Sequence, residues 1–390
     1  MTYPRETGKK KIIPLTKPFF DNREEKAAVA VLRSGWHTQG LQTELFEKEF
    51  ARIVDAKYAV ALSSCTAALH LALILARVGV RDEVIVPSFT YIACANVIRY
   101  VQGTPVFAEV DEKTFNIDAH DLEKKITKRT KAIIAVDQVG LPCDIDIIHK
   151  IAKRYNLFVI EDAACAIGSK YKGRMVGNLS AIACFSLHPR KIISTGEGGV
   201  ITTNDKNLAR AAKELRSHGA SIGAHARHTA KVVSFEKYNQ LGYNYRITDI
   251  QATIGRQQLK KLPMILKRRK FLAERYTKKL ARLSTIETPF VPSYAQPNWQ
   301  TYVIRLNRNY PLSQKRLMQK LLDCGISTRR GAMVSHLEPY YKNFLGTISL
   351  PKTEALAKST IALPLYPQMT IHQQDYVINN LYKFVDINKY

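Results

Sequence analysis

The sequence of 390 residues is short of acidic side chains, cysteine and long apolar runs. No stretch approaches the ~20 continuous apolar residues of a membrane-spanning helix. The first twenty residues also lack the apolar core of a secretory signal, so we expect a cytoplasmic protein without a membrane span. Six scattered cysteines without a CxxC pair exclude a disulfide scaffold and favour free thiols. An apolar content of 46% excludes a disordered chain.

Charge is the largest imbalance in the composition. Lys and Arg number 59 against 33 Asp and Glu, which gives a net charge of +26. The basic residues are spread along the chain and form no nucleic-acid-reading module, so we expect an anionic small-molecule substrate and no nucleic acid. The basic run at residues 267–270 is interpreted as a solvated helix face, with an acidic partner as the alternative. His225 and His228 lack a companion carboxylate or cysteine, so no metal site is predicted.

Apolar runs alternate with helical patterns up to about Leu262. The runs at residues 84–86 and 158–160 are continuously apolar, which is typical of strands buried on both faces. Strands that alternate with helices predict an α/β fold with a mostly parallel sheet.

The pattern changes at Pro263, which is predicted to open a basic amphipathic helix and a smaller α/β unit. We therefore expect an N-terminal segment (1–20), a large domain (21–262) and a small C-terminal domain (263–390). Residues 218–238 are polar and are interpreted as a long surface loop.

Ligands of open parallel sheets bind beyond the carboxyl ends of the strands, and three segments fall there. SSCTAALHLAL begins a helix after a strand, which indicates an anion site or ordinary N-capping. EDAA places Glu161 and Asp162 after a buried strand, where a carboxylate needs a positive partner or caps a helix. FSLHPRK, followed by GEGG, places Lys191 after another strand; a solvated surface lysine is the alternative.

Together the three segments match one chemistry, in which a lysine holds a phosphate-bearing pyridine aldehyde. Lys191 would form a Schiff base, favoured by a pKa that a desolvated, cation-rich pocket lowers. Asp162 would keep the pyridine nitrogen protonated, so that the ring accepts electrons. The helix start at Ser64 to Thr66 would hold the phosphate. Tyr91 would lie flat against the ring or be a core aromatic.

The chain resembles the DegT/StrS-type sugar aminotransferases, pyridoxal 5'-phosphate enzymes of the aspartate-aminotransferase fold (fold type I). The resemblance extends from IPLTKPFF through SGWHTQG and FEKEFA to LPLYPQMT, and its most specific strings are EDAA, FSLHPRK and GEGG. It implies a three-layer α/β fold with a mostly parallel central sheet and a smaller C-terminal α/β domain. It also implies a homodimer whose active sites are shared between two chains.

The resemblance further implies roles for individual residues. Lys191 matches the lysine that forms the internal aldimine and shuttles the proton, and Asp162 matches the acid on the pyridine nitrogen. Cys165 stands where relatives often carry Gln or His near the ring hydroxyl, and a thiol is a weaker hydrogen-bond donor. The other implied cofactor contacts are the phosphate turn, a phosphate hydroxyl, the stacked aromatic and a residue from the neighbouring subunit, namely Cys65, Thr66, Ser186, Tyr91 and Asn244.

The amino donor in such relatives is usually L-glutamate, and the acceptor is usually a keto sugar carried on a nucleoside diphosphate. We expect amination of a nucleotide-linked keto sugar, with C4 of a 4-keto-6-deoxy hexose preferred, for surface-glycan or glycosylated-metabolite synthesis. Relatives that dehydrate the sugar carry histidine in place of the lysine, so Lys191 favours transamination.

Three alternatives remain: C3 of a 3-keto nucleotide sugar, a keto-cyclitol, and a basic binding or regulatory protein on a degenerate aminotransferase fold. Substrate contacts are expected from basic side chains that suit a diphosphate, namely His188, Arg190, Arg329, Arg330 and His336.

Overall fold

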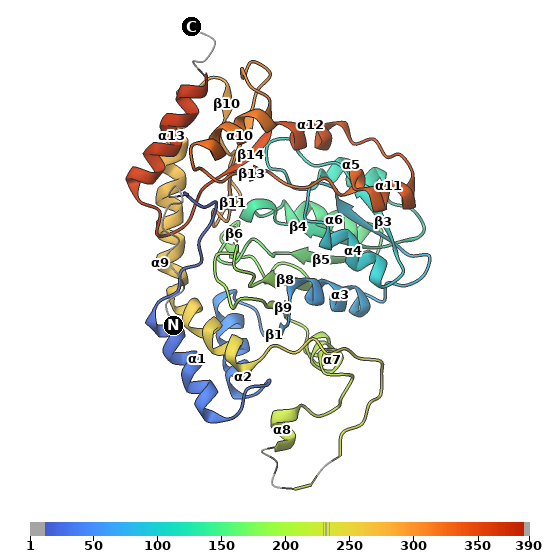
Figure 1. Cartoon of the computed structure of the whole chain (residues 1–390). Helices are drawn as coiled ribbons and strands as arrows, with labels where there is room; N and C mark the ends of the chain where they lie inside the picture. Colours follow the sequence, from blue (N-terminus) through green and yellow to red (C-terminus); the bar gives the residue numbers. More distant parts are fainter. Residues whose placement is uncertain (1–11, 229, 231, 234, 386–390) are drawn as a thin grey trace.

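A computed structural model describes residues 12–385, apart from 229, 231 and 234 (Figure 1). Its centre is a seven-stranded sheet in the spatial order β1–β9–β8–β5–β4–β2–β3. In the described sheet β9 is antiparallel to both of its neighbours, and the other adjacent pairs are parallel. The strands are β1 (Tyr58–Leu62), β2 (Glu83–Pro87), β3 (Thr104–Ala108), β4 (Thr130–Val136), β5 (Phe158–Asp162), β8 (Ile182–Ser186) and β9 (Gly199–Thr203).

Helices cover both faces of this sheet. One apolar cluster unites the sheet with α3 (Cys65–Leu75), α4 (Ala93–Tyr100) and α7 (Lys206–Arg216). The cluster on the other face includes α2 (Leu41–Ile53), α5 (Ala119–Lys124), α6 (Ile145–Arg154) and the first part of α9 (Asp249–Leu280), and α1 (Asn22–Ser34) packs on α9. The three-layer α/β fold with a mostly parallel central sheet is therefore confirmed.

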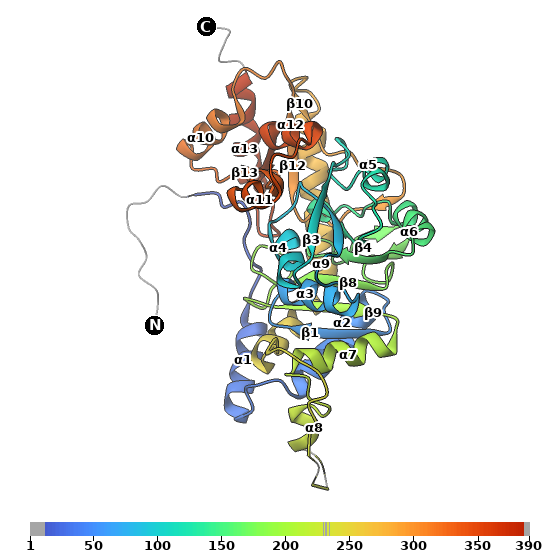
Figure 2. The same cartoon turned by 90° about the vertical axis from the view of Figure 1, so that its right-hand side faces the viewer.

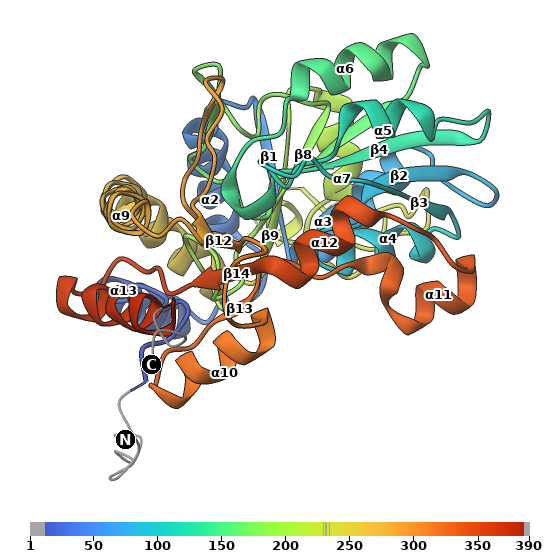
Figure 3. The same ribbon diagram turned by 90° about the horizontal axis from the view of Figure 1, so that it is seen from above.

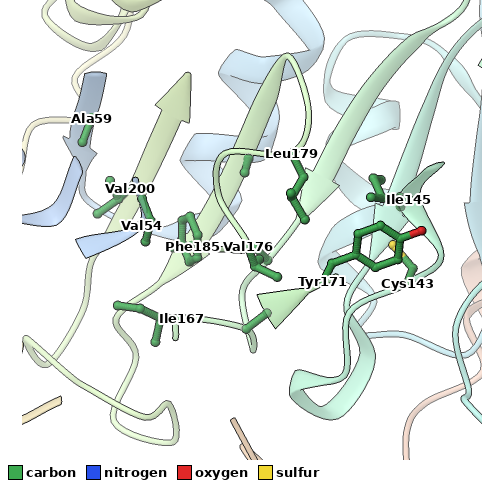
Figure 4. Close-up of a cluster of buried hydrophobic side chains, with 14 of the residues drawn as sticks. Val54, Ala59, Cys143, Ile145, Ile167, Tyr171, Val176, Leu179, Phe185 and Val200 are labelled. Carbon is green, nitrogen blue, oxygen red and sulfur yellow. The ribbon is translucent and has the colours of Figure 1, made fainter. Parts of the chain in front are cut away.

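Strand β2 shows why the apolar runs are continuous. All five of its residues are buried. Ile85 packs into the cluster beneath α2 and α6, whereas Val84 and Val86 pack into the cluster beneath α3 and α4. Successive side chains of a strand point to opposite faces, so a strand covered on both faces needs apolar residues throughout. Figure 4 shows part of the cluster beneath α2 and α6, including Phe185 of β8 and Val200 of β9.

The helix predicted to open at Pro263 begins earlier. Pro263 lies inside α9, which starts at Asp249. Thr248 and Gln251 form a capping box, in which each side chain accepts a hydrogen bond from the other residue's backbone N–H. The prediction was wrong because this cap starts the helix, and a proline inside a helix removes one backbone hydrogen bond without ending it here. The boundary predicted after residue 262 thus falls within one continuous helix.

The C-terminal part contains a four-stranded antiparallel sheet in the order β10–β12–β14–β13. The second half of α9 packs on its core beside α13, and Figure 3 views α9 end-on next to α13. The strands are β10 (Ile286–Glu287), β12 (Tyr302–Leu306), β13 (Arg329–Arg330) and β14 (Thr360–Leu363). The helices are α10 (Gln314–Asp323), α11 (Pro339–Leu345), α12 (Pro351–Ser359) and α13 (Ile371–Val385). This unit is the smaller α/β part of the predicted fold.

Short elements complete the described chain. A three-stranded sheet in the order β11–β6–β7 lies beside the main sheet. Its strands are β6 (Lys170–Tyr171), β7 (Arg174–Met175) and β11 (Ala295–Gln296), and two 3-10 turns are η1 (Gln138–Gly140) and η2 (Ser335–Leu337). In the part of the chain that the structure describes, none of the helices has the length and apolar content needed to cross a bilayer.

The segment predicted as a long surface loop extends away from the body and includes the short helix α8 (Ala224–His228) (Figures 1 and 2). Four described apolar side chains of this region are strongly exposed. We call them the apolar arm: Val232 (78% exposed), Val233 (84%), Phe235 (86%) and Leu241 (82%). Exposed apolar groups gathered on one segment mark an interaction surface.

Candidate active site

The predicted site lies where three parallel strands end. Strand β5 ends at Asp162, and its neighbour β8 places Cys184 directly opposite that residue before ending at Ser186. Strand β1 runs in the same direction and leads through Ser64 into α3. The carboxyl ends of these strands share one edge of the sheet, which is where ligands of such folds bind. Asp162, Ser186 and the start of α3 are thus brought to one edge.

Lys191 follows β8 in a tight turn. Its backbone N–H donates to the His188 carbonyl at 2.8 Å. Its Nζ donates to Cys165 Sγ at 3.1 Å. Lys191 and Cys165 line one cavity of about 180 Å³. The lysine therefore points into a cavity at the sheet edge and is not a solvated surface residue.

The charge state of Lys191 differs from the prediction. Burial alone would lower the pKa of Lys191, but the adjacent Cys165 sulfur and the Asp162 carboxylate together raise it above its ordinary value. The lowered pKa expected from a cation-rich pocket is wrong in this structure, because the strongest influences on the amine besides burial come from the Cys165 sulfur and the Asp162 carboxylate. The same Asp162 carboxylate thus stabilises the ammonium form.

Asp162 is buried, with each carboxylate oxygen engaged by one donor. Its Oδ1 accepts from the Ala164 backbone N–H at 3.0 Å, and its Oδ2 accepts from Cys94 Sγ at 2.9 Å. Burial raises the pKa of Asp162, while these two bonds and the charge of Lys191 oppose the rise. A buried carboxylate of this kind attracts a further positive or proton-bearing group. The contact from Cys94 was not predicted.

The start of α3 is both capped and closely packed. Ser64 Oγ accepts from the Ala67 N–H at 3.1 Å, so N-capping is present. The first amides of a helix have no acceptor within the helix itself, so the start of α3 suits a phosphate. A Cβ at Gly199 would lie 2.3 Å from the Ser64 carbonyl and 2.5 Å from the Cys65 nitrogen. Glycine therefore lets β9 approach this turn.

The remaining cofactor contacts that the sequence predicted lie near the surface. Thr66 and Ser186 are half-buried, and Ser186 Oγ accepts from the His188 N–H at 3.4 Å. Tyr91 is 67% exposed, so it is not a core aromatic. Asn244 is also exposed and pairs with Ser217 in an isolated bridge ahead of α9. Their roles toward the cofactor stay predictions.

Three predicted substrate residues line the same cavity as Lys191, namely Arg190, Arg329 and Arg330. Burial lowers the pKa of Arg329, and the charge of Arg190 lowers it further. In the described part of the chain none of the three forms an ion pair with an acid. Guanidinium groups beside one cavity have the chemistry to bind an anion.

His336 is placed differently from the prediction of a substrate contact. Its side chain is buried, with Nδ1 at 2.7 Å from Ser88 Oγ and Nε2 at 3.4 Å from Glu354. Burial lowers the pKa of His336, although Glu354 opposes this. Since both ring nitrogens already have partners, the side chain has none free for a substrate.

The cavity also contains residues that the sequence did not single out. Thr16 of the N-terminal segment and Gln300 of the C-terminal part line it. Gln300 Nε2 donates to the Arg190 carbonyl at 2.6 Å, so the small unit supports the turn that carries Lys191. These residues carry no local sequence signal, because their contacts join segments far apart in the chain.

The donor set fits a phosphorylated pyridine aldehyde. A lysine amine, a buried carboxylate and the start of helix α3 lie at one sheet edge, and these are the groups that an aldehyde, a ring nitrogen and a phosphate require. Across the described residues, no group of three His, Cys, Asp or Glu side chains is arranged to hold a metal ion.

The chain is similar to known proteins over almost its whole length. The model of the DegT/DnrJ/EryC1/StrS aminotransferase family matches residues 18–382. The chain is 38% identical over 370 residues to the spore coat polysaccharide biosynthesis protein SpsC of Bacillus subtilis, covering 94% of this chain and 95% of that protein.

Two solved structures are similar throughout. The PLP-form of the putative sugar aminotransferase Spr1654 from Streptococcus pneumoniae has a TM-score of 0.88 at 29% identity, covering 96% of this chain and 99% of that one. Helicobacter pylori PseC, an aminotransferase involved in the biosynthesis of pseudoaminic acid, has a TM-score of 0.89 at 28% identity, covering 96% and 100%.

Fold and site therefore define a pyridoxal-phosphate-dependent aminotransferase. The chain belongs to the DegT/DnrJ/EryC1/StrS aminotransferase family, and its class is that of the sugar aminotransferases.

Proposed function

We propose that the protein transfers the amino group of L-glutamate to a nucleotide-linked keto sugar, with C4 of a 4-keto-6-deoxy hexose as the acceptor carbon. One observation carries the proposal: the Lys191 amine shares a cavity with arginines that have no acid partner in the described chain. An amine at that position suits carbonyl chemistry, and the guanidinium groups suit an anionic substrate. SpsC, a relative named for polysaccharide biosynthesis, supports a sugar acceptor.

Lys191 and Asp162 would have separate roles in the reaction. The cofactor, when bound, supplies an aldehyde for the lysine amine and a ring that accepts electrons. In the proposed mechanism, Lys191 is displaced by the amino donor and then moves a proton at the substrate carbon as a general base and acid. Asp162 holds the proton on the ring nitrogen, and its buried position keeps water from competing for that proton.

The arginines would bind the diphosphate of the substrate. Arg190 and Arg329 are close enough for their charges to interact, as the lowered pKa of Arg329 indicates. Such a pair is destabilised without an anion between its members, so binding of a diphosphate removes the repulsion. Their planar groups also allow bidentate contacts, which would fix the sugar relative to Lys191.

We further propose a homodimer with shared active sites, located in the cytoplasm. The apolar arm supports the dimer, because its four strongly exposed side chains need a partner surface. Exposed Asn244 lies near the base of this arm and would reach the phosphate bound by the neighbouring subunit. All six cysteines are free, which is in keeping with a reducing compartment.

The acceptor is tested by supplying L-glutamate with candidate acceptors to purified enzyme loaded with pyridoxal phosphate. The panel contains a 4-keto-6-deoxy nucleotide sugar, a 3-keto nucleotide sugar and a keto-cyclitol, and mass spectrometry detects the aminated product. We expect the product with the 4-keto substrate and its loss in Arg329→Ala, since that change removes one phosphate contact. Product from the cyclitol alone would refute the proposed substrate.

A further inference from the structure

A cysteine lies behind the carboxylate of the proposed ring-nitrogen partner. Cys94 comes from α4, is 2% exposed, and places Sγ at 2.9 Å from Asp162 Oδ2. Thr90 Oγ1 lies 3.3 Å from the same sulfur. The thiol is therefore fixed between a hydroxyl and the carboxylate, and it links α4 to the end of β5.

The hydrogen bonds of Asp162 leave room for one more donor. Ala164 N–H occupies one lone pair of Oδ1, and Cys94 occupies one lone pair of Oδ2. An ionised carboxylate has about four acceptor positions, so lone pairs remain for a ligand. One oxygen is bonded from the turn after β5 and the other from α4, so the carboxylate is restrained from rotating.

The donor is also a weak one. A thiol donates a weaker hydrogen bond than a hydroxyl or an amide. It therefore orients a carboxylate while withdrawing little of its negative charge. Cys65 and Cys184 are buried close by, and burial together with the charge of Asp162 raises the pKa of each thiol, so these neighbours stay neutral. In the described chain only Cys94 among these three donates a hydrogen bond to Asp162.

We propose that Cys94 is a positioning residue for the transamination, whose thiol holds the Asp162 side chain in place and leaves its charge available for the ring nitrogen. The inference rests on the proposed role of Asp162 opposite that nitrogen. It explains why a buried thiol, and not an apolar side chain, faces this carboxylate from α4.

The test uses pyridoxal phosphate labelled with ¹⁵N in the ring, whose NMR resonance reports whether the nitrogen carries a proton. It is recorded in the holoenzyme for wild type, Cys94→Ser and Cys94→Ala, together with kcat. The serine and alanine variants are alike in size but differ in the donor. We expect Cys94→Ala to move the resonance toward the deprotonated value at neutral pH and to lower kcat roughly tenfold, the order of one lost hydrogen bond.

The donor and packing roles give different results. A donor role predicts that Cys94→Ser keeps the protonated resonance and a kcat within about threefold of wild type. Equal resonances in Cys94→Ser and Cys94→Ala would overturn the inference. The matched control is Cys184→Ala, which removes a buried thiol that lies opposite Asp162 without bonding it. A shift in this control as large as that in Cys94→Ala would also overturn it.

Two further variants keep the outcome decisive. Cys94→Val fills the space without a donor, and it replaces Cys94→Ala if thermal unfolding shows that the alanine variant does not fold. Asp162→Asn tests the role on which the inference rests. If Asp162→Asn leaves the resonance unchanged, the proposed function of Asp162 fails. If Asp162→Asn shifts the resonance and neither Cys94→Ala nor Cys94→Val does, only the role of Cys94 fails.

Discussion

At the scale of single residues, the adjacent acids Asp162 and Glu161 differ in their hydrogen bonding. Asp162 accepts hydrogen bonds on both oxygens. Glu161 points to the other face of β5, and in the described chain neither of its carboxylate oxygens has a hydrogen-bond donor. The same holds for Oδ2 of Asp137, the residue that follows β4. Burial raises the pKa of Asp137 to about 7, although Glu161 opposes this rise, and burial together with the charge of Asp137 raises the pKa of Glu161 well above its ordinary value. We infer that they share a proton.

The shared proton makes stability depend on pH. The pKa of Asp137 is 3.8 when unfolded and about 7 when folded, so the native state binds a proton that the unfolded state has released. The contribution of Asp137 to stability is fully present below about pH 4 and is lost as the pH rises through about 7, by a few kcal/mol in order of magnitude. Asp137→Asn removes the titrating group, so we expect the free energy of unfolding to vary less over this range. Urea denaturation at a series of pH values measures it.

Asp146 provides the control for this prediction. It lies at the surface and pairs with Lys172 and Arg174, which lower the pKa of its carboxyl to about 2. Its substitution by asparagine leaves the loss of stability between pH 4 and 7 in place. An Asp137→Asn variant with the wild-type pH profile would show that the two buried acids do not exchange a proton in this range.

The individual residues also mark the limit of sequence reasoning. Asp162 and Lys191 could be placed because each follows an apolar strand in a distinctive string. Cys94 could not, since it meets Asp162 across 68 residues of chain and looks like an ordinary core cysteine in its own helix. His336 was placed in the substrate site from its basic side chain, whereas the fold buries it against Ser88 and Glu354.

At the scale of elements, strands were easier to predict than helix starts. The runs that form β2, β4 and β5 are apolar on both faces. A short run of this kind is typical of a strand that is buried on both faces, so its structure could be predicted. The start of α9 was predicted at the wrong residue because proline is common in the first turn of a helix. The N-cap is Thr248, which lies in a polar stretch. The packing of β9 against the first turn of α3 is a tertiary contact, and no local sequence pattern predicts it.

This contact can be tested with a single methyl group. Gly199→Ala would place a Cβ within 2.5 Å of backbone atoms of Ser64 and Cys65, so the start of α3 must shift. We expect a loss of stability of about 1–3 kcal/mol and weaker binding of pyridoxal phosphate, because the displaced amides no longer meet the phosphate. Thermal unfolding of the apoenzyme and equilibrium dialysis with the cofactor measure the two effects.

Gly79→Ala is the matched substitution, since a Cβ there meets nothing within 4 Å. It leaves both stability and cofactor affinity close to those of wild type. Unchanged cofactor affinity in Gly199→Ala would contradict the assignment of the phosphate to the start of α3.

At the scale of the whole molecule, one helix joins two cores and the four described side chains of the apolar arm are strongly exposed. Helix α9 contributes its first half to the large core and its second half to the C-terminal core. The boundary predicted at residue 262 therefore falls inside a continuous helix that both cores share. The segment around α8 extends away from the body (Figure 2). Sequence alone suggested a polar surface loop there, because its apolar residues are few and scattered among charged ones.

The proposed sharing of sites predicts complementation between two inactive variants. Lys191→Ala removes the amine, and Asn244→Asp brings a negative charge toward the partner's phosphate. A mixed dimer has one site with both native residues, so random mixing restores about a quarter of the wild-type activity. The measurement is the rate of amino transfer after the two purified variants are unfolded together and refolded. Activity no higher than in either variant refolded alone would mean that Asn244 and Lys191 of one site come from the same chain, and it would contradict the shared site.

The most direct test of the account is to locate the lysine that bonds the cofactor. Borohydride treatment of the holoenzyme makes that bond permanent, and peptide mass spectrometry then identifies the modified residue. The account predicts a phosphopyridoxyl group on Lys191 and none on any other lysine, with the modification absent from Lys191→Ala. Modification of a different lysine, or none in an enzyme that still transfers amino groups, would contradict it.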